Sequence, residues 1–196
     1  MPTSKLEDES TCGGRLPMRI MAIADTDDVT WAGPSPRVDL VVSCGDVYTP
    51  VIQAAAKACP AASVVAVKGN HDLPAAFPLP IIDLHLRVIT LPNGLRVGGF
   101  NGCWRYKPRG NFLYSQNEAA VLLQQLPAVD ILVAHNSPGG IHERDAVAHQ
   151  GFVALSEYLH RHSPGLLIHG HQHVNRETLV GRTRVVGVYG CRRIEV

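Results

Sequence analysis

The feature that most limits the fold of this chain is a set of short segments that are apolar almost throughout and are each followed by polar residues. None of these segments alternates apolar and polar residues, and that uniformity is typical of strands buried on both faces. Buried parallel strands occur in α/β domains, where helices cover the sheets. The segments are Arg19–Ala24, Val38–Ser43, Ser63–Val67, Ile131–Ala134 and Leu166–Ile168.

The stretches between these predicted strands carry helix and hairpin signals. Ser115 and Glu118 have the spacing of a capping box at the start of a helix. We expect helices over Pro50–Ala58, Ser115–Leu126 and Phe152–His162. We also expect a hairpin within Leu86–Phe100 around Pro92-Asn93-Gly94, and two or three strands after Arg176 that are broken at Gly181 and Gly190. The elements together predict an α/β fold of two mixed β-sheets packed together, with helices outside.

Composition excludes several classes of function. The chain has 196 residues, of which 45% are hydrophobic, and this is enough for a core. Its formal net charge of +1 argues against a polyanion binder, so a long nucleic-acid duplex is not an expected partner. No apolar run approaches the roughly 18 residues of a membrane span, and residues 1–17 resemble a flexible tail rather than a secretory signal. Five cysteines without a CxxC pair favour a reducing cytoplasm.

Residues of the kind that bind metals follow each of the five predicted strands. Histidine stands out in number, because eight of the ten lie between His135 and His173. The carboxyl ends of parallel strands meet at one edge of a sheet, so we expect these side chains to converge there. A single Asp after a strand is most often a cap or turn residue, and only the ordered series is specific. Its members are Asp25, Asp27, Asp46, Asn70, His71, His135, His171 and His173.

The ordered series resembles the calcineurin-like metallophosphoesterases. It reads Asp-x-Asp, Gly-Asp, Gly-Asn-His-Asp, His and Gly-His-x-His along nearly all of residues 18–196. The loop that begins at His135, together with the Gly170-His171 motif, resembles the small, single-domain bacterial branch of the family. The resemblance implies a four-layer sandwich of two mixed β-sheets flanked by helices, in one catalytic domain over residues 18–196 without a cap domain.

The resemblance also implies a site with two divalent metal ions. One ion would take Asp25, Asp46, His173 and the residue at position 27, and the second would take Asp46, Asn70, His135 and His171. A hydroxide bridging the two ions would attack phosphorus. His71 resembles the histidine that contacts phosphoryl oxygens or protonates the leaving oxygen, and Asp72 would orient His71 or stabilise its charged form.

Position 27 departs from the family pattern, which is Asp-x-His. With two divalent cations, two carboxylates and a hydroxide the cluster carries about +1, and ligation by Asp27 would bring it to about neutral. That charge favours Mn²⁺ or iron, with Zn²⁺, Mg²⁺ or Ni²⁺ as alternatives. Direct ligation by Asp27, contact through a water, and a site that has lost its first metal all remain open.

Substrate contacts are the least constrained part of the sequence. A basic and aromatic stretch, residues 104–111, is either a substrate-binding loop or an ordinary solvated one. Its basic residues and one from a later loop are the candidate substrate contacts: Arg105, Lys107, Arg109 and Arg144. We expect a small phosphoester substrate, with diesters favoured over monoesters. The alternative is a catalytically weak or inactive scaffold of the same fold that binds a protein partner, and homo-oligomerisation stays open.

Overall fold

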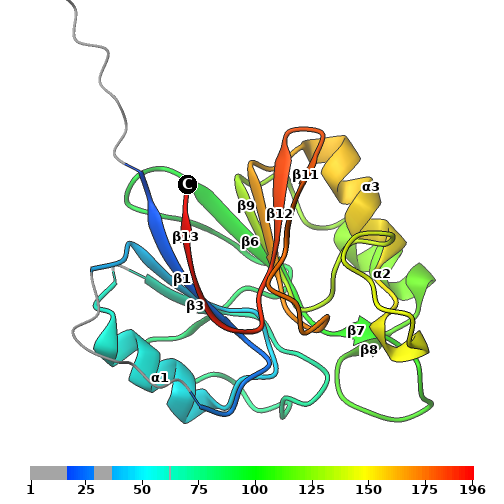
Figure 1. The fold of residues 1–196 in the computed structure, drawn as a ribbon, viewed down its shortest axis with the longest axis horizontal. Helices are drawn as coiled ribbons and strands as arrows, with labels where there is room; N and C mark the ends of the chain where they lie inside the picture. Colours follow the sequence, from blue (N-terminus) through cyan, green and yellow to red (C-terminus); the bar gives the residue numbers. More distant parts are fainter. Residues whose placement is uncertain (1–16, 29–36, 62) are drawn as a thin grey trace, which may run out of the picture.

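Two β-sheets lie face to face in the computed structural model, which describes residues 17–28, 37–61 and 63–196 (Figure 1). The predicted N-terminal tail lies outside these residues except for Pro17. The first sheet has the order β13-β1-β2-β3-β4. Its strands are β1 (Arg19–Ala24), β2 (Leu40–Ser43), β3 (Ser63–Ala66), β4 (Ile82–Asp83) and β13 (Gly190–Glu195). Strands β1 to β4 are parallel and β13 is antiparallel to β1, so this sheet is mixed.

The second sheet has the order β11-β12-β10-β9-β6-β5. Its strands are β5 (Val88–Thr90), β6 (Arg96–Phe100), β9 (Ile131–Ala134), β10 (Leu166–His169), β11 (Glu177–Val180) and β12 (Thr183–Gly187). The four central strands are parallel, and hairpins add β5 and β11 as antiparallel edges. A small ladder pairs β7 (Cys103–Trp104) with β8 (Leu113–Tyr114).

Helices cover the outer face of each sheet, as Figure 1 shows. Helix α1 (Thr49–Ala58) packs Ile52 and Ala55 against the first sheet. Helices α2 (Gln116–Leu123) and α3 (Val153–His162) cover the second sheet, where Leu155 packs in one cluster with Leu132. A separate cluster that includes Val42 and Val133 fills the space between the sheets. The predicted α/β fold of two mixed sheets with helices outside is therefore confirmed.

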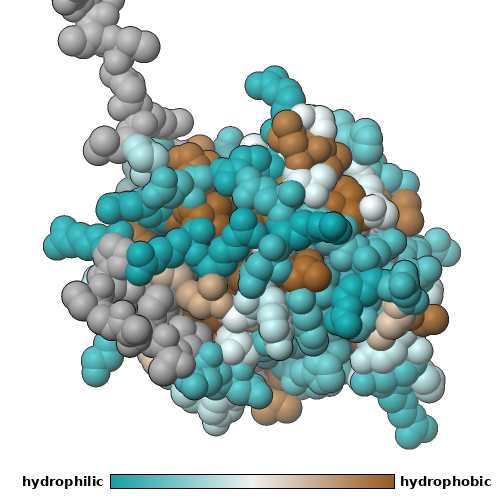
Figure 2. Space-filling view, in the orientation of Figure 1, coloured by the Kyte–Doolittle hydropathy of each residue, from teal (hydrophilic) through white to brown (hydrophobic). Residues whose placement is uncertain are grey.

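Hydrophilic side chains cover most of the face seen in Figure 2, and apolar ones show between them in small separate groups. Large apolar side chains that are exposed come from different elements of the described chain, for example Leu79 from the loop before β4 and Leu179 from β11. Single exposed apolar residues are normal on a folded protein. They carry no functional argument here.

Several element ends differ from the predicted ones. The capping box of α2 forms as expected, because the Ser115 Oγ accepts from the Glu118 backbone N–H at 3.2 Å and Glu118 Oε2 accepts from the Ser115 N–H at 2.7 Å. The helix ends at Leu123 rather than Leu126, because the chain turns ahead of Pro127, which cannot continue a helix. Strand β2 begins only at Leu40, although the preceding Val38 is buried.

The C-terminal segment ties the two sheets together. A turn at Gly181, where φ is +59°, joins β11 to β12, and Gly190, where φ is +75°, begins β13 in the other sheet. Both breaks follow from the two glycines, which adopt this left-handed conformation without strain. Within the described ranges, no helix is long and apolar enough to cross a membrane.

Candidate metal centre

The loops that follow β2, β9, β10 and β1 meet at one edge of the two sheets. The Nδ1 atom of His135, just after β9, lies 2.9 Å from the carbonyl oxygen of Cys44, just after β2. The backbone N–H of His171, after β10, donates to Asp25 Oδ2, after β1, at 2.7 Å. Each contact joins one sheet to the other, so residues far apart in the sequence share a single site.

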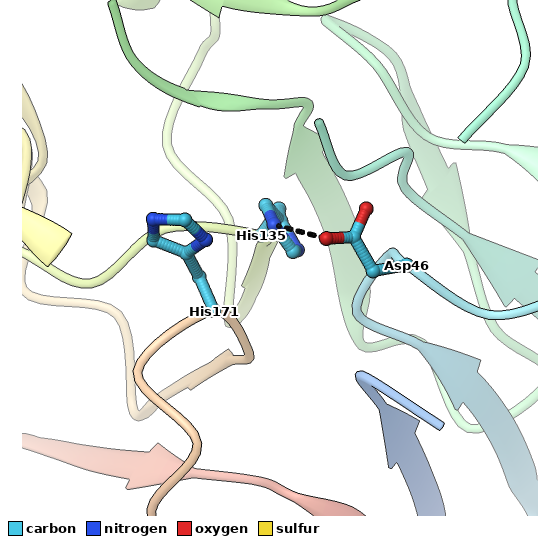
Figure 3. A group of neighbouring side chains, drawn as sticks. All are labelled: Asp46, His135 and His171. Carbon is cyan, nitrogen blue, oxygen red and sulfur yellow. Dashed lines mark ion pairs between the residues drawn. The ribbon is translucent and has the colours of Figure 1, made fainter. Parts of the chain in front are cut away.

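Three side chains form the most compact group at this edge. The ligand atoms of Asp46, His135 and His171 all lie within 4.8 Å of one another, and Figure 3 shows the His135 ring between the other two. Because Nδ1 of His135 donates to the Cys44 carbonyl, its Nε2 faces Asp46 Oδ2 at 3.4 Å and Asn70 Oδ1 at 3.2 Å. One ring nitrogen and two oxygens thus converge on a point that only a cation or a proton can occupy favourably.

The protonation of these groups reflects that convergence. Burial opposes charge on His135, but the carboxylates of Asp46 and Asp25 outweigh it and raise its pKa to about 9. A proton on Nε2 then stands where a metal ion would bind. His171 donates from Nε2 to the Ala148 carbonyl at 2.8 Å, which leaves Nδ1 as a free electron-pair donor. Burial, with the charge on His135, lowers the pKa of His171 to about 3, so the ring is neutral, as a metal ligand must be.

Asp25 and His173 form a second pair next to this group. Asp25 Oδ1 is buried and accepts no hydrogen bond from any described residue, and it lies 3.5 Å from Nε2 of the exposed His173. Burial raises the pKa of Asp25 to about 7, and the nearby Asp46 adds to the effect, although His135 opposes it. A buried carboxylate oxygen without a partner is costly unless a cation binds it, so this pair fits a metal ion.

Four of the predicted ligands have a strained backbone. The φ angles are +52° at Asp25, +54° at Asp46, +63° at His171 and +51° at His173, all in the left-handed region. Non-glycine residues rarely adopt this conformation, and each costs on the order of 1–3 kcal/mol. Four other described residues share this conformation, namely Leu86, Phe112, His142 and Ser163, so half of the eight non-glycine cases lie at predicted ligands.

Two glycines and Asp72 hold the ligand loops close together. A Cβ on Gly69 would overlap the Asp46 carboxylate, and one on Gly170 would lie 2.7 Å from Asp25 Oδ2. Asp72 Oδ2 accepts the backbone N–H groups of Gly69 at 2.7 Å and Asp46 at 2.8 Å. These hydrogen bonds join the loops after β2 and β3, and the predicted role of Asp72, to orient His71 or stabilise its charged form, stays a prediction.

His71 and Asp27 lie at the rim of a hollow beside the compact group. The hollow has a volume of about 230 Å³, and its lining includes both residues together with Asp46. Both side chains are exposed. The backbone N–H of His71 donates to Asp46 Oδ1 at 2.7 Å, which ties the His71 loop to the metal centre. Asp27 stands outside the compact group, so its ligation of a metal stays a proposal.

The four predicted substrate contacts have different surroundings. Arg105 forms an ion pair with Glu118 at 2.9 Å and donates to the Leu113 carbonyl at 3.0 Å. Its guanidinium is therefore bound within the protein. The Lys107 ammonium lies 5.1 Å from the centre of the Tyr106 ring, and Arg109 is exposed. The loop that carries them is anchored to the site, because Asn111 Nδ2 donates to the Asp72 carbonyl at 2.9 Å.

Arg144 and two residues that the sequence reasoning left out lie closer to the ligands. The charge of Arg144 contributes, after burial, to lowering the pKa of His173 and of His149. The His149 ring centre lies 5.1 Å from that of His171, and its Nδ1 is buried without a partner among the described residues. Lys68, just before Gly69, lines the hollow and is only 6% exposed. Spacing alone carries no signal for either residue.

Solved structures with the same fold have low sequence identity to the chain. TT1561 of Thermus thermophilus is 16% identical, with a TM-score of 0.58 and coverage of 89% of this chain and 90% of that one. The phosphopantetheinyl hydrolase PptH from Mycobacterium tuberculosis is 14% identical, with a TM-score of 0.52 and the same two coverages. At these identities the likeness extends to the fold alone. A comparison with curated proteins found no match.

A family comparison identifies the chain more directly. The model of the calcineurin-like phosphoesterase superfamily domain matches residues 18–188, which include every predicted metal ligand. The match spans all the strand ends that meet at the candidate metal centre, and it agrees with the resemblance carried by the ordered motifs. The chain therefore belongs to the calcineurin-like phosphoesterase superfamily.

Proposed function

We propose that this protein hydrolyses phosphoester bonds, preferring small phosphodiesters, with two divalent cations bound at the candidate metal centre. The observation that carries the proposal is the convergence of Asp46, His135 and His171 within 4.8 Å, beside a buried Asp25 oxygen that accepts no hydrogen bond from any described residue. Nε2 of His135 faces both Asp46 Oδ2 and Asn70 Oδ1, and Nε2 of His173 faces Asp25 Oδ1. Nitrogen and oxygen donors gathered in this way suit a divalent cation.

The residues fall into two ligand sets that share Asp46. Asp25, His173 and Asp27 would complete one set, and Asn70, His135 and His171 the other. Cations bound there would neutralise phosphoryl oxygens and lower the pKa of a bound water to about 7. Asp46 suits the shared position because it stays ionised. Burial raises its pKa, but its neighbours, chiefly His135, outweigh that effect and lower the pKa to about 2. It is therefore ionised at every working pH.

The remaining groups would act on the substrate. His71 is exposed at the rim of the hollow, where its imidazole can donate a proton to the leaving oxygen. Arg144 supplies the positive charge that acts on the His173 side of the site, and we assign it to a phosphoryl oxygen. Asp72 would fix the loop that presents His71, through its hydrogen bonds to Gly69 and Asp46.

The acid at position 27 supports the choice of substrate and metal. Ligation by Asp27 would bring the charge of the metal cluster to about neutral. The electrostatic attraction of a monoester dianion would then weaken more than that of a phosphodiester monoanion. The additional carboxylate also favours Mn²⁺ or iron over Zn²⁺. Replacing Asp27 with His and with Ala separates its possible roles. If both variants keep the metal content and activity of the wild type, Asp27 has no place in the site.

Turnover of bis-p-nitrophenyl phosphate with added Mn²⁺ tests the proposal. We expect hydrolysis by the wild type and a loss of about 10²–10⁴-fold in His71→Ala, with the metal content retained. The matched control is His160→Ala, which removes an exposed histidine from α3, away from the metal centre. If the wild type shows no turnover with any divalent metal, the protein is a scaffold that keeps the fold and binds a partner.

A further inference from the structure

The hollow beside the metal centre contains a cation that the proposed chemistry does not use. Lys68 lines it and is 6% exposed, so nearly all of its side chain is buried. Its backbone is fixed on both sides, since its N–H donates to Asn101 Oδ1 at 2.8 Å and its carbonyl accepts from Gly102 at 2.7 Å. Lys68 is therefore a buried residue with a fixed backbone and not an exposed surface lysine.

The ammonium of Lys68 forms no ion pair with any carboxylate of the described residues. Asp72 and Asp83 are close enough for their charges to act on it, but neither lies within ion-pair distance. Its Nζ lies 3.8 Å from the ring centre of Phe77. This cation–π contact stabilises the ammonium without neutralising it, and an anion supplied from outside would pair its charge.

The other charged groups of the hollow do not supply that anion. Asp72 directs one oxygen at two backbone N–H groups, and Asp46 accepts from the His71 N–H with one oxygen and faces His135 with the other. Asp27 lies on the rim and is exposed. Asp46 and Asp72 are thus engaged at the metal centre or with backbone, whereas Lys68, whose Nζ lies over the Phe77 ring, lines the hollow without a carboxylate partner among the described residues.

The rest of the lining suits a small organic group. Leu73, Ala75 and Ala76 give it an apolar wall, and Tyr48 and Thr49 begin helix α1, whose N-terminus no described side chain caps. The partial positive charge of a helix N-terminus adds to that of Lys68. A volume of about 230 Å³ is below the roughly 300–1,000 Å³ of drug-sized ligand sites, so the group is compact.

We propose that this hollow binds the alcohol portion of the phosphoester, and that Lys68 selects substrates in which that portion carries a second anionic group such as a carboxylate. The proposal rests on the proposed function, because the phosphoryl group must lie at the metal centre for its alcohol portion to lie in the hollow. His71, at the rim between the two, would then face the leaving oxygen. The site is a specificity pocket and takes no part in bond cleavage.

Two non-hydrolysable probes of the same shape test the proposal by binding. One is 3-carboxybenzylphosphonate and the other is 3-carbamoylbenzylphosphonate, which replaces the carboxylate with a neutral amide. We expect calorimetric titration of the Mn²⁺-loaded wild type to give about tenfold or tighter binding of the carboxylate, because hydrogen bonds to charged groups are the strong ones. Lys68→Met should remove the preference, and Lys68→Arg should retain most of it. Thermal unfolding checks that both variants fold.

The matched control is Lys57→Met, which removes an exposed lysine from the last turn of α1. This variant should keep the preference for the carboxylate probe. If Lys57→Met also loses that preference in a salt-dependent way, the preference comes from the general charge of the protein, and the proposed pocket is refuted. The same preference in wild type and Lys68→Met also overturns it. Hydrolysis of bis-p-nitrophenyl phosphate with Mn²⁺ is measured separately. A lysine-dependent binding preference without hydrolysis contradicts the proposed function but supports the pocket, so the two failures are distinguishable.

Discussion

Replacing Asp25 with Asn should change the stability of the protein in opposite directions with and without metal. The side chain is buried, and its pKa is raised from the ordinary 3.8 to about 7, mainly by desolvation. A raised carboxyl pKa means that folding favours the protonated form, so stability falls as the pH rises from about 4 to 7. The full shift corresponds to ~4 kcal/mol, and relaxation of the site reduces this to about 1–3 kcal/mol.

Asparagine keeps the shape of the residue and removes its charge. Its carbonyl oxygen can accept from the His171 N–H, as Asp25 Oδ2 does at 2.7 Å, and its amide can donate to Nε2 of His173, now 3.5 Å from Oδ1. In EDTA at pH 8 we therefore expect Asp25→Asn to be more stable than the wild type by about 1–3 kcal/mol, with the difference vanishing near pH 4.

Urea unfolding followed by circular dichroism measures the free energy of unfolding both in EDTA and in Mn²⁺. With saturating Mn²⁺ the wild type gains the linkage free energy of binding, about 2.7 kcal/mol at a hundredfold excess over Kd, and the variant loses much of it. The order of stability should then reverse. If Asp25→Asn destabilises the protein equally in EDTA and in Mn²⁺, the carboxylate is a structural group, and the reasoning from its unpartnered oxygen is refuted.

Three further predictions concern the loops and their protonation. Metal affinity should rise between pH 6 and 9, because Asp25, with a pKa of about 7, and His135, with a pKa of about 9, must both lose protons before a metal ion binds. Calorimetry in buffers of different ionisation enthalpy should show this proton release. A metal affinity that does not change with pH would contradict the prediction. Gly69→Ala should abolish Mn²⁺ binding, because its Cβ overlaps the Asp46 carboxylate. Gly165→Ala, whose Cβ would lie 3.7 Å from the Asp130 carbonyl oxygen, should bind normally, as measured by metal analysis after dialysis. Ser115→Ala should lower the unfolding free energy by about 1 kcal/mol through loss of the α2 cap while Mn²⁺ affinity stays unchanged, and a change in affinity would couple α2 to the site.

The sequence predicted the sheets well because buried strands impose a simple pattern. Arg19–Ala24 and Ile131–Ala134 are apolar almost throughout, and both form central strands with the predicted bounds. The ends of α2 and β2 were harder, since they depend on local competition. Leu126 is buried and matches the helical pattern, yet Pro127 ends the helix before it. A hydrophobic pattern predicts that a residue is buried, but it does not determine whether that residue lies in a helix or in a turn.

The site was predictable only where its residues belong to an ordered series. Asp46, His135 and His171 follow strands that the sequence reveals, and the structure brings them together. Lys68 and His149 carry no such signal, because their positions depend on how loops fold over the site. The same limit applies to Arg105, whose pairing with Glu118 follows from the position of α2 and not from the basic stretch that contains it.

Anomalous diffraction from crystals grown with Mn²⁺ would test the central claim most directly. We expect two manganese peaks that share Asp46, one bound by His135, His171 and Asn70 and the other by Asp25 and His173. Their separation should be about 3.5–4 Å, as in other two-metal sites. Peaks elsewhere in the molecule, or no peak among these side chains at saturating Mn²⁺, would contradict it.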